Sequence, residues 1–75
     1  MPLHNPNYDY EEKVRLNFPV KWKDKTYSEV EGTIATVDSS GIFEDNTQCY
    51  YDVFIELDGE TILYKHIKES NLLPL

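Results

Sequence analysis

The sequence has little of what would hold a small protein together covalently or place it in a membrane. Cys49 is its only cysteine, which excludes an internal disulfide and leads us to expect a reducing, cytoplasmic setting. No stretch approaches the roughly 20 apolar residues of a membrane-spanning helix. The N-terminal region has no basic start followed by an apolar run, so we expect neither a membrane span nor a signal peptide.

Recognised catalytic and metal-binding spacings are also missing. There is no Gly-x-Ser-x-Gly element and no glycine-rich phosphate loop, and no nucleophile has an evident base. His4 and His66 do not combine with Cys49 at a metal-ligand spacing, and the acids of residues 43–48 do not follow the calcium-loop pattern. We therefore expect a protein that is not an enzyme and that holds no metal or cofactor.

Positive charge is absent from the middle of the chain. The sequence has 14 acidic and 7 basic residues, a net charge of -7, and no Lys or Arg lies between Thr26 and Tyr64, where nine acids occur. This distribution repels phosphate backbones. It leaves two interpretations open, a solvated surface that favours solubility and an acidic face that binds a basic protein. The residues that we expect to form such a face are Glu44, Asp45, Asp52 and Glu56.

What the sequence does contain is enough apolar surface for one small domain. Apolar residues make up 40% of the 75 residues and aromatic residues 13%, which is too much for a disordered segment. Residues 1–7 contain two prolines and no periodicity, so we expect a flexible lead-in there and a single domain over residues 8–75.

Short alternating stretches predict strands rather than helices. The clearest is YYDVFIEL (50–57), in which Tyr51, Val53, Ile55 and Leu57 share one face and Phe54 lies on the other. Pro19 predicts an edge, a bulge or a break in its stretch, and Gly32 a bulge or a close approach of backbones. The five expected strands are VRLNFPVKW (14–22), VEGTIATVD (30–38), YYDVFIEL (50–57), TILYKHI (61–67) and LLPL (72–75).

The connections suggest how these strands are arranged. Residues 23–29 are polar enough for a loop, residues 39–49 form the longest and most mobile connection, and Asp58-Gly59 is a tight-turn signal. Residues 68–71 predict a single 3₁₀ turn. The last strand should pair with the first, with Leu72, Leu73 and Leu75 covering one end. The sequence therefore predicts an all-β fold, a small five-stranded SH3-like barrel with a 3₁₀ turn before the last strand.

The chain resembles a known family from about residue 14 to residue 75. The residues that carry the likeness are Gly32-Thr33-Ile34, Tyr51–Leu57, Asp58-Gly59 and Asn71–Leu75. In these elements the sequence resembles SH3-like barrels of the Tudor and KOW type, and in particular small bacterial and phage SH3-like domains of unknown function. The resemblance implies a barrel fold and suggests a phage or prophage accessory protein. It does not identify the partner, because barrels of this kind bind many unrelated molecules.

Three functional hypotheses follow. The first is a non-enzymatic interaction module whose acidic face binds a basic protein, with nucleic acid an unlikely partner. The second is a DNA-mimicking inhibitor of a host nucleic-acid-binding enzyme, because carboxylates spaced like phosphates can occupy a basic channel. The third is a nucleic-acid-binding barrel of KOW type or a methyl-lysine-binding barrel of Tudor type.

Two clusters bear on the third hypothesis. Trp22, Tyr27 and Tyr50 are the candidates for an aromatic cage around a cation, although aromatic rings also supply much of the core of a small domain. The stretch KWKDK places three lysines on alternate positions, as Lys21, Lys23 and Lys25. They would either contact an anion or guard an edge strand.

Overall fold

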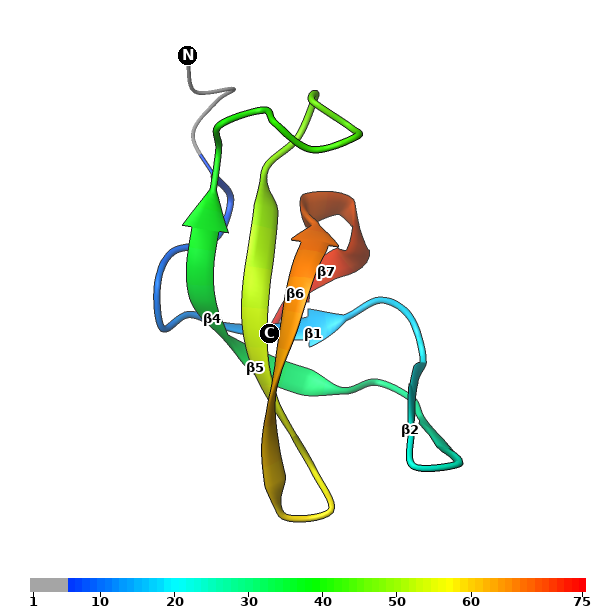
Figure 1. Ribbon diagram of the computed structural model, residues 1–75. Helices are drawn as coiled ribbons and strands as arrows, with labels where there is room; N and C mark the ends of the chain where they lie inside the picture. The colour runs from blue at the N-terminus through cyan, green and yellow to red at the C-terminus, as the bar shows by residue number, and fades with distance from the viewer. Residues whose placement is uncertain (1–5) are drawn as a thin grey trace.

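The computed structural model describes residues 6–75, which form strands and one 3₁₀ turn (Figure 1). The prediction of an all-β fold is confirmed for these residues. Their elements are β1 (Lys13–Leu16), β2 (Val20–Trp22), β3 (Lys25–Tyr27), β4 (Glu31–Asp38), β5 (Tyr50–Leu57), β6 (Glu60–Lys68), η1 (Glu69–Asn71) and β7 (Leu72–Pro74). Most of the predicted lead-in, residues 1–7, lies outside the described part of the chain, as does His4.

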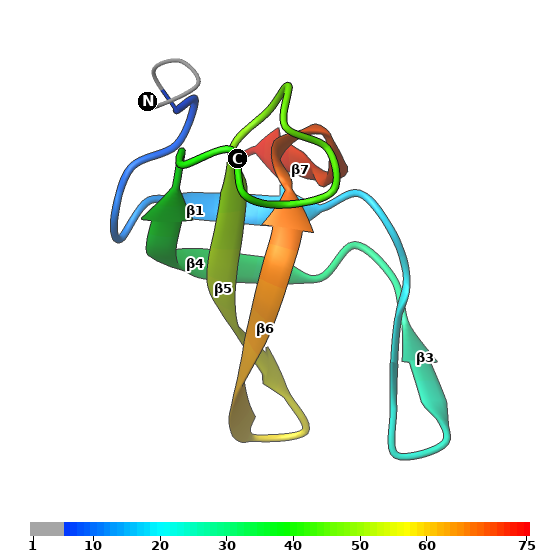
Figure 2. The same cartoon turned by 45° about the horizontal axis from the view of Figure 1, so that its top comes forward.

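Five strands form one antiparallel sheet in the order β6-β5-β4-β1-β7, and β2 and β3 form a separate two-stranded sheet. Figure 2 shows the β2–β3 hairpin standing to one side of the larger sheet. β7 pairs with β1, as predicted, with Leu72 opposite Leu16. Over residues 6–75, however, β6 and β7 remain the two edges of the sheet and do not pair with each other. The expected closed barrel is therefore not observed.

The first predicted strand and the loop after it were wrong in detail. Residues 14–22 do not form one strand, because β1 ends at Leu16 and β2 begins at Val20. Pro19 lies in the break and cannot donate a ladder hydrogen bond. Residues 23–29, expected as a loop, contain β3. The β2–β3 turn has positive φ at both central residues, Lys23 (49°) and Asp24 (64°), as in the type I′ turn that suits the twist of a hairpin. The described chain thus has seven strands rather than five.

The core lies against one face of the sheet. Its fully buried side chains are Val14, Leu16, Ile34, Cys49, Tyr51, Val53 and Ile55. On β5 the predicted alternation is confirmed, since Tyr51, Val53, Ile55 and Leu57 are buried whereas Phe54 and Glu56 are exposed. Burial of the Cys49 thiol raises its pKa, which disfavours the reactive thiolate.

Gly32 allows β4 to pass very close to β5. It is paired with Val14 of β1 on one side and with Ile55 of β5 on the other. A Cβ atom at position 32 would lie 2.5 Å from Cγ1 of Val53 and 2.6 Å from the carbonyl oxygen of Phe54. The predicted close approach of backbones at Gly32 is therefore confirmed.

The chain segments at the two ends of the domain meet around Tyr51. The hydroxyl of Tyr51 donates to Oε2 of Glu69 at 2.6 Å, and the backbone N–H of Asn7 reaches the same oxygen at 3.0 Å. The Tyr8 hydroxyl donates to the carbonyl oxygen of Leu72 at 3.2 Å. Burial and the adjacent Glu69 carboxylate raise the pKa of the Tyr51 hydroxyl. The 3₁₀ turn η1 is thereby tied to the core, and its position before the last strand matches the prediction.

The last strand buries fewer of its leucines than expected. Leu72 is 3% exposed and belongs to the core, whereas Leu73 is 41% and Leu75 57% exposed. Leu73 lies opposite Arg15 in the β1–β7 ladder, and side chains of neighbouring residues in a strand point to opposite faces. The prediction that all three leucines cover one end of the fold is therefore wrong for Leu73 and Leu75.

We predict that Leu72→Ala and Leu73→Ala differ strongly in their cost. Removing the buried Leu72 side chain should lower the free energy of unfolding by about 2–5 kcal/mol, while removing the half-exposed Leu73 side chain should change it by less than about 1 kcal/mol. Urea denaturation of both variants measures the difference. Equal, small losses would show that β7 does not contribute to the core.

We also predict that Gly32→Ala destabilises the fold by about 1–3 kcal/mol or more, because the added methyl group overlaps a backbone oxygen that cannot move alone. The control is Gly59→Ala. A Cβ at Gly59 meets no atom within 4 Å, so that this variant carries only the strain of φ +79°. Thermal unfolding compares the two. A smaller loss for Gly32→Ala than for Gly59→Ala would contradict the tight packing of β4 on β5.

Candidate interaction surface

The face of the larger sheet that points away from the core carries apolar side chains among its charges. On β5 the residues Asp52, Phe54 and Glu56 alternate with buried ones and therefore share this outer face. Phe54 is 46% exposed, and Leu63, its direct cross-strand partner on β6, is 40% exposed. Isolated exposed apolar residues are ordinary, but these two adjoin each other.

The strand registers align the outward-facing residues in rows across the sheet. One row runs from β1 to β6 and consists of Lys13, Thr33, Phe54 and Leu63, each opposite the next. A neighbouring pair on β1 and β4 is Arg15 and Glu31, and a neighbouring pair on β5 and β6 is Glu56 and Thr61. Residues from four strands thus meet on one face, although they lie far apart in the sequence.

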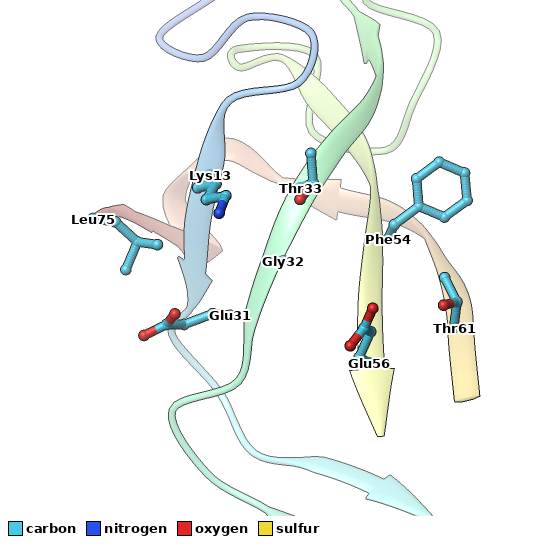
Figure 3. Close-up of a pocket in the computed structure, with 8 residues that line it drawn as sticks. All are labelled: Lys13, Glu31, Gly32, Thr33, Phe54, Glu56, Thr61 and Leu75. Atoms are coloured by element: carbon cyan, nitrogen blue, oxygen red, sulfur yellow. The ribbon is translucent and has the colours of Figure 1, made fainter. Parts of the chain in front are cut away.

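A groove of about 300 Å³ lies on this face. We call it the outer groove, and its lining residues are Lys13, Glu31, Gly32, Thr33, Phe54, Glu56, Thr61 and Leu75. Figure 3 shows β4 in the middle with Gly32 and Thr33, the side of β1 with Lys13 and Leu75, and the side of β5 and β6 with Phe54, Glu56 and Thr61. Between these sides, β4 contributes the side chain of Thr33 and the backbone of Gly32.

The carboxylates of the outer groove differ in their partners. Glu31 forms an ion pair with Arg15 at 3.3 Å, and both side chains are substantially exposed. Such an exposed ion pair holds the Glu31 side chain only weakly. Within residues 6–75, Glu56 makes no ion pair and no side-chain hydrogen bond. Its carboxylate is available to a cation that enters the groove.

The four residues expected to form an acidic face come from two different elements. Asp52 and Glu56 share the outer face of β5, whereas Glu44 and Asp45 lie in the connection between β4 and β5. Asp45 organises that connection, because its carboxylate accepts hydrogen bonds from the N–H and hydroxyl of Thr47 and from the amide of Gln48. The Thr47 hydroxyl, followed by the other donors, lowers the Asp45 pKa to about 2.

Asp52 also has a local structural role. The register of β5 and β6 shifts between Tyr51 and Val53, and His66 on the opposite strand has a φ of 59°. The carboxylate of Asp52 accepts the His66 backbone N–H at 3.0 Å. Asp52 therefore supports a β-bulge, in which an extra residue leaves a backbone group without its ladder partner.

The connection between β4 and β5 has no regular secondary structure, as predicted, but is held by side chains. The ring of Phe43 lies 4.4 Å from that of Tyr50 and 4.9 Å from that of His66, measured between centroids. Asp38 accepts hydrogen bonds from the hydroxyl and N–H of Ser40, which lower its pKa. These contacts fasten the connection at both ends.

The aromatic residues proposed for a cage are not brought together. Trp22 and Tyr27 belong to the β2–β3 hairpin, whereas Tyr50 starts β5 and packs on Phe43. The Tyr27 hydroxyl bonds Asp58, just beyond the far end of β5, and an eight-residue strand spans about 25 Å. The cationic group over the Trp22 ring is the chain's own Lys23, whose Nζ lies 4.5 Å from the ring centroid.

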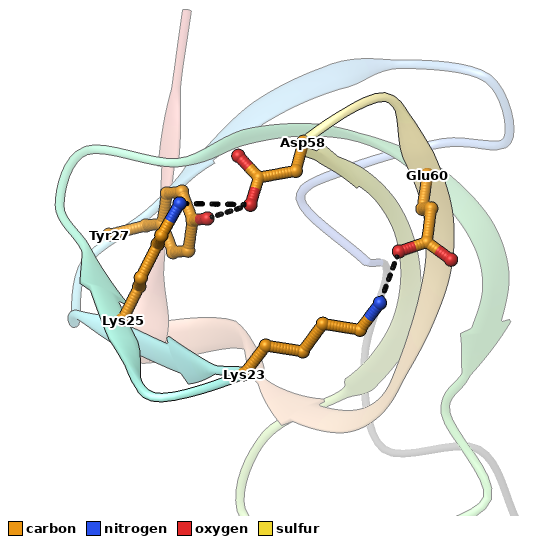
Figure 4. Close-up of polar contacts among 5 residues, drawn as sticks. All are labelled: Lys23, Lys25, Tyr27, Asp58 and Glu60. Carbon is orange, nitrogen blue, oxygen red and sulfur yellow. Dashed lines mark hydrogen bonds and ion pairs between the residues drawn. The ribbon is translucent and has the colours of Figure 1, made fainter.

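A polar clasp fastens the β2–β3 hairpin to the turn between β5 and β6 (Figure 4). We define this clasp by Lys23, Lys25, Tyr27, Asp58 and Glu60. Lys23 pairs with Glu60 at 2.9 Å and Lys25 with Asp58 at 3.6 Å, while the Tyr27 hydroxyl donates to Asp58 at 2.6 Å. The lysines predicted to share one strand face are therefore divided. Lys21 lies within β2, Lys23 in the turn and Lys25 at the start of β3.

The described residues offer no site for a metal ion, since residues 6–75 contain no group of three His, Cys, Asp or Glu side chains that would coordinate one. Nor does that part of the chain contain a helix long and apolar enough to cross a bilayer. No protein-family model matches the chain, and neither a curated protein nor a solved structure is significantly similar to it.

Sequence reasoning recognised part of the outer groove. The alternation of β5 places Phe54 and Glu56 on one face, and this much is visible in the sequence. Leu63 opposite Phe54 follows from counting outwards from the Asp58-Gly59 turn. Lys13, Thr33 and Leu75 could not be assigned to the groove, because their positions depend on the registers of β1, β4 and β7.

We predict that the clasp weakens in acid. The Tyr27 hydroxyl, followed by Lys25, lowers the pKa of Asp58 from its ordinary 3.8. The carboxylate therefore stabilises the fold above the unfolded-state pKa, and this contribution is lost as the pH falls through the lower folded-state value. In Tyr27→Phe the Asp58 pKa should rise towards 3.8. NMR titration of the Asp58 carboxyl carbon in both proteins tests this, and identical midpoints would contradict the clasp.

Proposed function

We propose that this protein is a non-enzymatic interaction module that binds a basic protein surface through the outer face of its sheet. The observation that carries the proposal is the combination on that face of exposed apolar side chains, Phe54 and Leu63, with the carboxylate of Glu56, which forms no ion pair within residues 6–75. Interfaces combine an apolar centre with a charged rim that selects the partner. The net charge of -7 favours a basic partner.

An SH3-like arrangement is the finer interpretation of the fold that we propose. The strand order β6-β5-β4-β1-β7, the 3₁₀ turn before the last strand and the return of that strand to β1 support it. The connection between β1 and β4 holds the β2–β3 hairpin, and the clasp brings this hairpin back to the end of β5. The protein would then enclose its core through side-chain contacts rather than through a closed ladder.

The alternatives receive less support. A DNA mimic requires a run of unpaired carboxylates, but Glu31, Asp58 and Glu60 are ion-paired and apolar residues interrupt the outer face. A KOW-type nucleic-acid site would use the lysines of the hairpin, and two of these are held in the clasp. A Tudor-type cage would require Trp22, Tyr27 and Tyr50 to meet, and they lie apart.

We predict that the wild-type protein binds a basic probe, poly-L-lysine, and does not bind duplex DNA at moderate salt. Binding to poly-L-lysine should weaken as salt rises, since exposed charges are screened over about 8–10 Å. Glu56→Lys should slow association at unchanged stability, because this side chain is exposed and forms no ion pair within residues 6–75.

Stopped-flow fluorescence measures the association rate. The control is the same charge reversal at another exposed acid, Asp24. If the control variant slows association equally, overall charge alone governs binding and the outer face has no special role. Salt-sensitive binding of duplex DNA that is lost when Lys21, Lys23 and Lys25 are replaced would support the nucleic-acid alternative instead.

A further inference from the structure

We propose that the outer groove binds an extended segment of a partner protein that carries one arginine or lysine beside an aliphatic residue. The inference rests on the proposed function and assigns it a defined site and a defined ligand chemistry. The cation would lie at Glu56 against the face of the Phe54 ring, and the aliphatic residue would lie near Leu75 and the floor formed by Gly32 and Thr33.

The first argument is the apolar surface that the fold leaves uncovered. Phe54, Leu63 and Leu75 are 46%, 40% and 57% exposed. Phe54 and Leu63 face each other across β5 and β6, and Phe54 and Leu75 line the same groove. Adjoining exposed apolar residues rimmed by polar ones are typical of an interaction site. A charged side chain at such a position would increase the solubility of a small protein. Solubility therefore does not explain why these three residues are apolar.

The second argument is the shape of the groove. β1 and β5 flank β4 as its two ladder neighbours, so their backbones lie about 10 Å apart. The intervening β4 residues are Thr33, whose small side chain is on the outer face, and Gly32, which lines the groove with its backbone alone. The groove is about 300 Å³ in volume and open to solvent. It therefore suits a chain segment or a long side chain lying on the sheet better than an enclosed small molecule.

The third argument is charge complementarity. Glu56 lies on the β5 side of the trough without an ion-pair partner among the described residues, and Glu31 shares its charge only with the exposed Arg15. Lys13 lies on the opposite side, so an entering cation is directed towards Glu56. Phe54 and Glu56 lie two residues apart on the same face of β5. Both a ring face and a carboxylate attract a guanidinium or ammonium group, so this pair favours a cation.

A second copy of this chain is a poorer occupant. Each molecule carries a net charge of -7, which opposes the approach of two identical acidic faces. Nucleic acid is opposed by the same charge. A basic peptide is attracted both by the negative net charge of the protein and by the local ion pair with Glu56. Both interactions favour its binding.

The test uses a fluorescein-labelled peptide of alternating arginine and leucine, with a control peptide of alternating glutamate and leucine. The wild-type protein should bind the arginine peptide and not the glutamate peptide. Amide NMR signals of Thr33, Phe54, Glu56 and Thr61 should shift on titration, while those of the β2–β3 hairpin remain in place. Absence of arginine-peptide binding, or shifts spread over the whole protein, would overturn the inference.

Matched variants separate the groove from general acidity. Glu56→Gln and Phe54→Ala should each weaken binding about three- to tenfold. Asp24→Asn, which makes the same charge change as Glu56→Gln at the hairpin tip, should weaken it less than about twofold. Asp24 has a φ of 64°, which asparagine tolerates.

The outcomes distinguish the two proposals. If Asp24→Asn and Glu56→Gln weaken binding equally, or if Phe54→Ala binds like the wild type, the groove is not the site although a basic partner is still bound. If Thr33 and Phe54 signals change with protein concentration in the absence of peptide, the groove is occupied by a second copy and the inference is wrong. Circular dichroism of each variant verifies that the fold is intact.

Discussion

The close approach of β4 to β5 at Gly32 is the constraint on which the rest of the structure depends. Within residues 6–75, β4 is the middle strand of the larger sheet and pairs with β1 on one side and with β5 on the other. A side chain at position 32 would separate β4 from β5 and loosen the contacts of Val53 and Ile55. Val53 and Ile55 belong to the core, so the packing of the buried face of the sheet depends on the missing side chain at this position.

Departures from regular pairing occur in both ladders of β5. The register shifts between Ile34 and Thr36 in the β4–β5 ladder and between Tyr51 and Val53 in the β5–β6 ladder. Bulges increase the local twist of a sheet. The second bulge requires a left-handed His66, whose backbone N–H is accepted by Asp52. An acidic residue that appears in the sequence to be one more surface charge is in fact a backbone partner.

The parts of the fold that could be predicted are those set by local pattern. Alternation identified the buried face of β5, Asp58-Gly59 identified the turn to β6, and the apolar C-terminal stretch identified a strand that returns to β1. The β2–β3 hairpin could not be predicted, because its turn has Lys23-Asp24 where Asn-Gly would be expected. Its position depends on contacts with Asp58 and Glu60, which are more than thirty residues away.

In the candidate site, too, local pattern could be predicted from the sequence and longer-range contacts could not. Phe54 and Glu56 share a face by simple alternation, so sequence alone places them together. The grouping of Glu44 and Asp45 with Asp52 and Glu56 rested on charge alone, and charge does not distinguish a free carboxylate from one that accepts hydrogen bonds from Thr47 or His66. The grouping of Trp22, Tyr27 and Tyr50 failed because composition does not show which end of β5 each residue lies near.

The placement of the single thiol has a consequence for the chemistry of the whole molecule. Cys49 is fully buried, and its thiol is held in the protonated form by its surroundings. Oxidants and alkylating agents react with thiolates that they can reach. We therefore expect modification of Cys49 to require local opening near η1, where the N–H of Glu69 donates to the Cys49 carbonyl oxygen. The rate at which this thiol reacts should then report the stability of that end of the sheet.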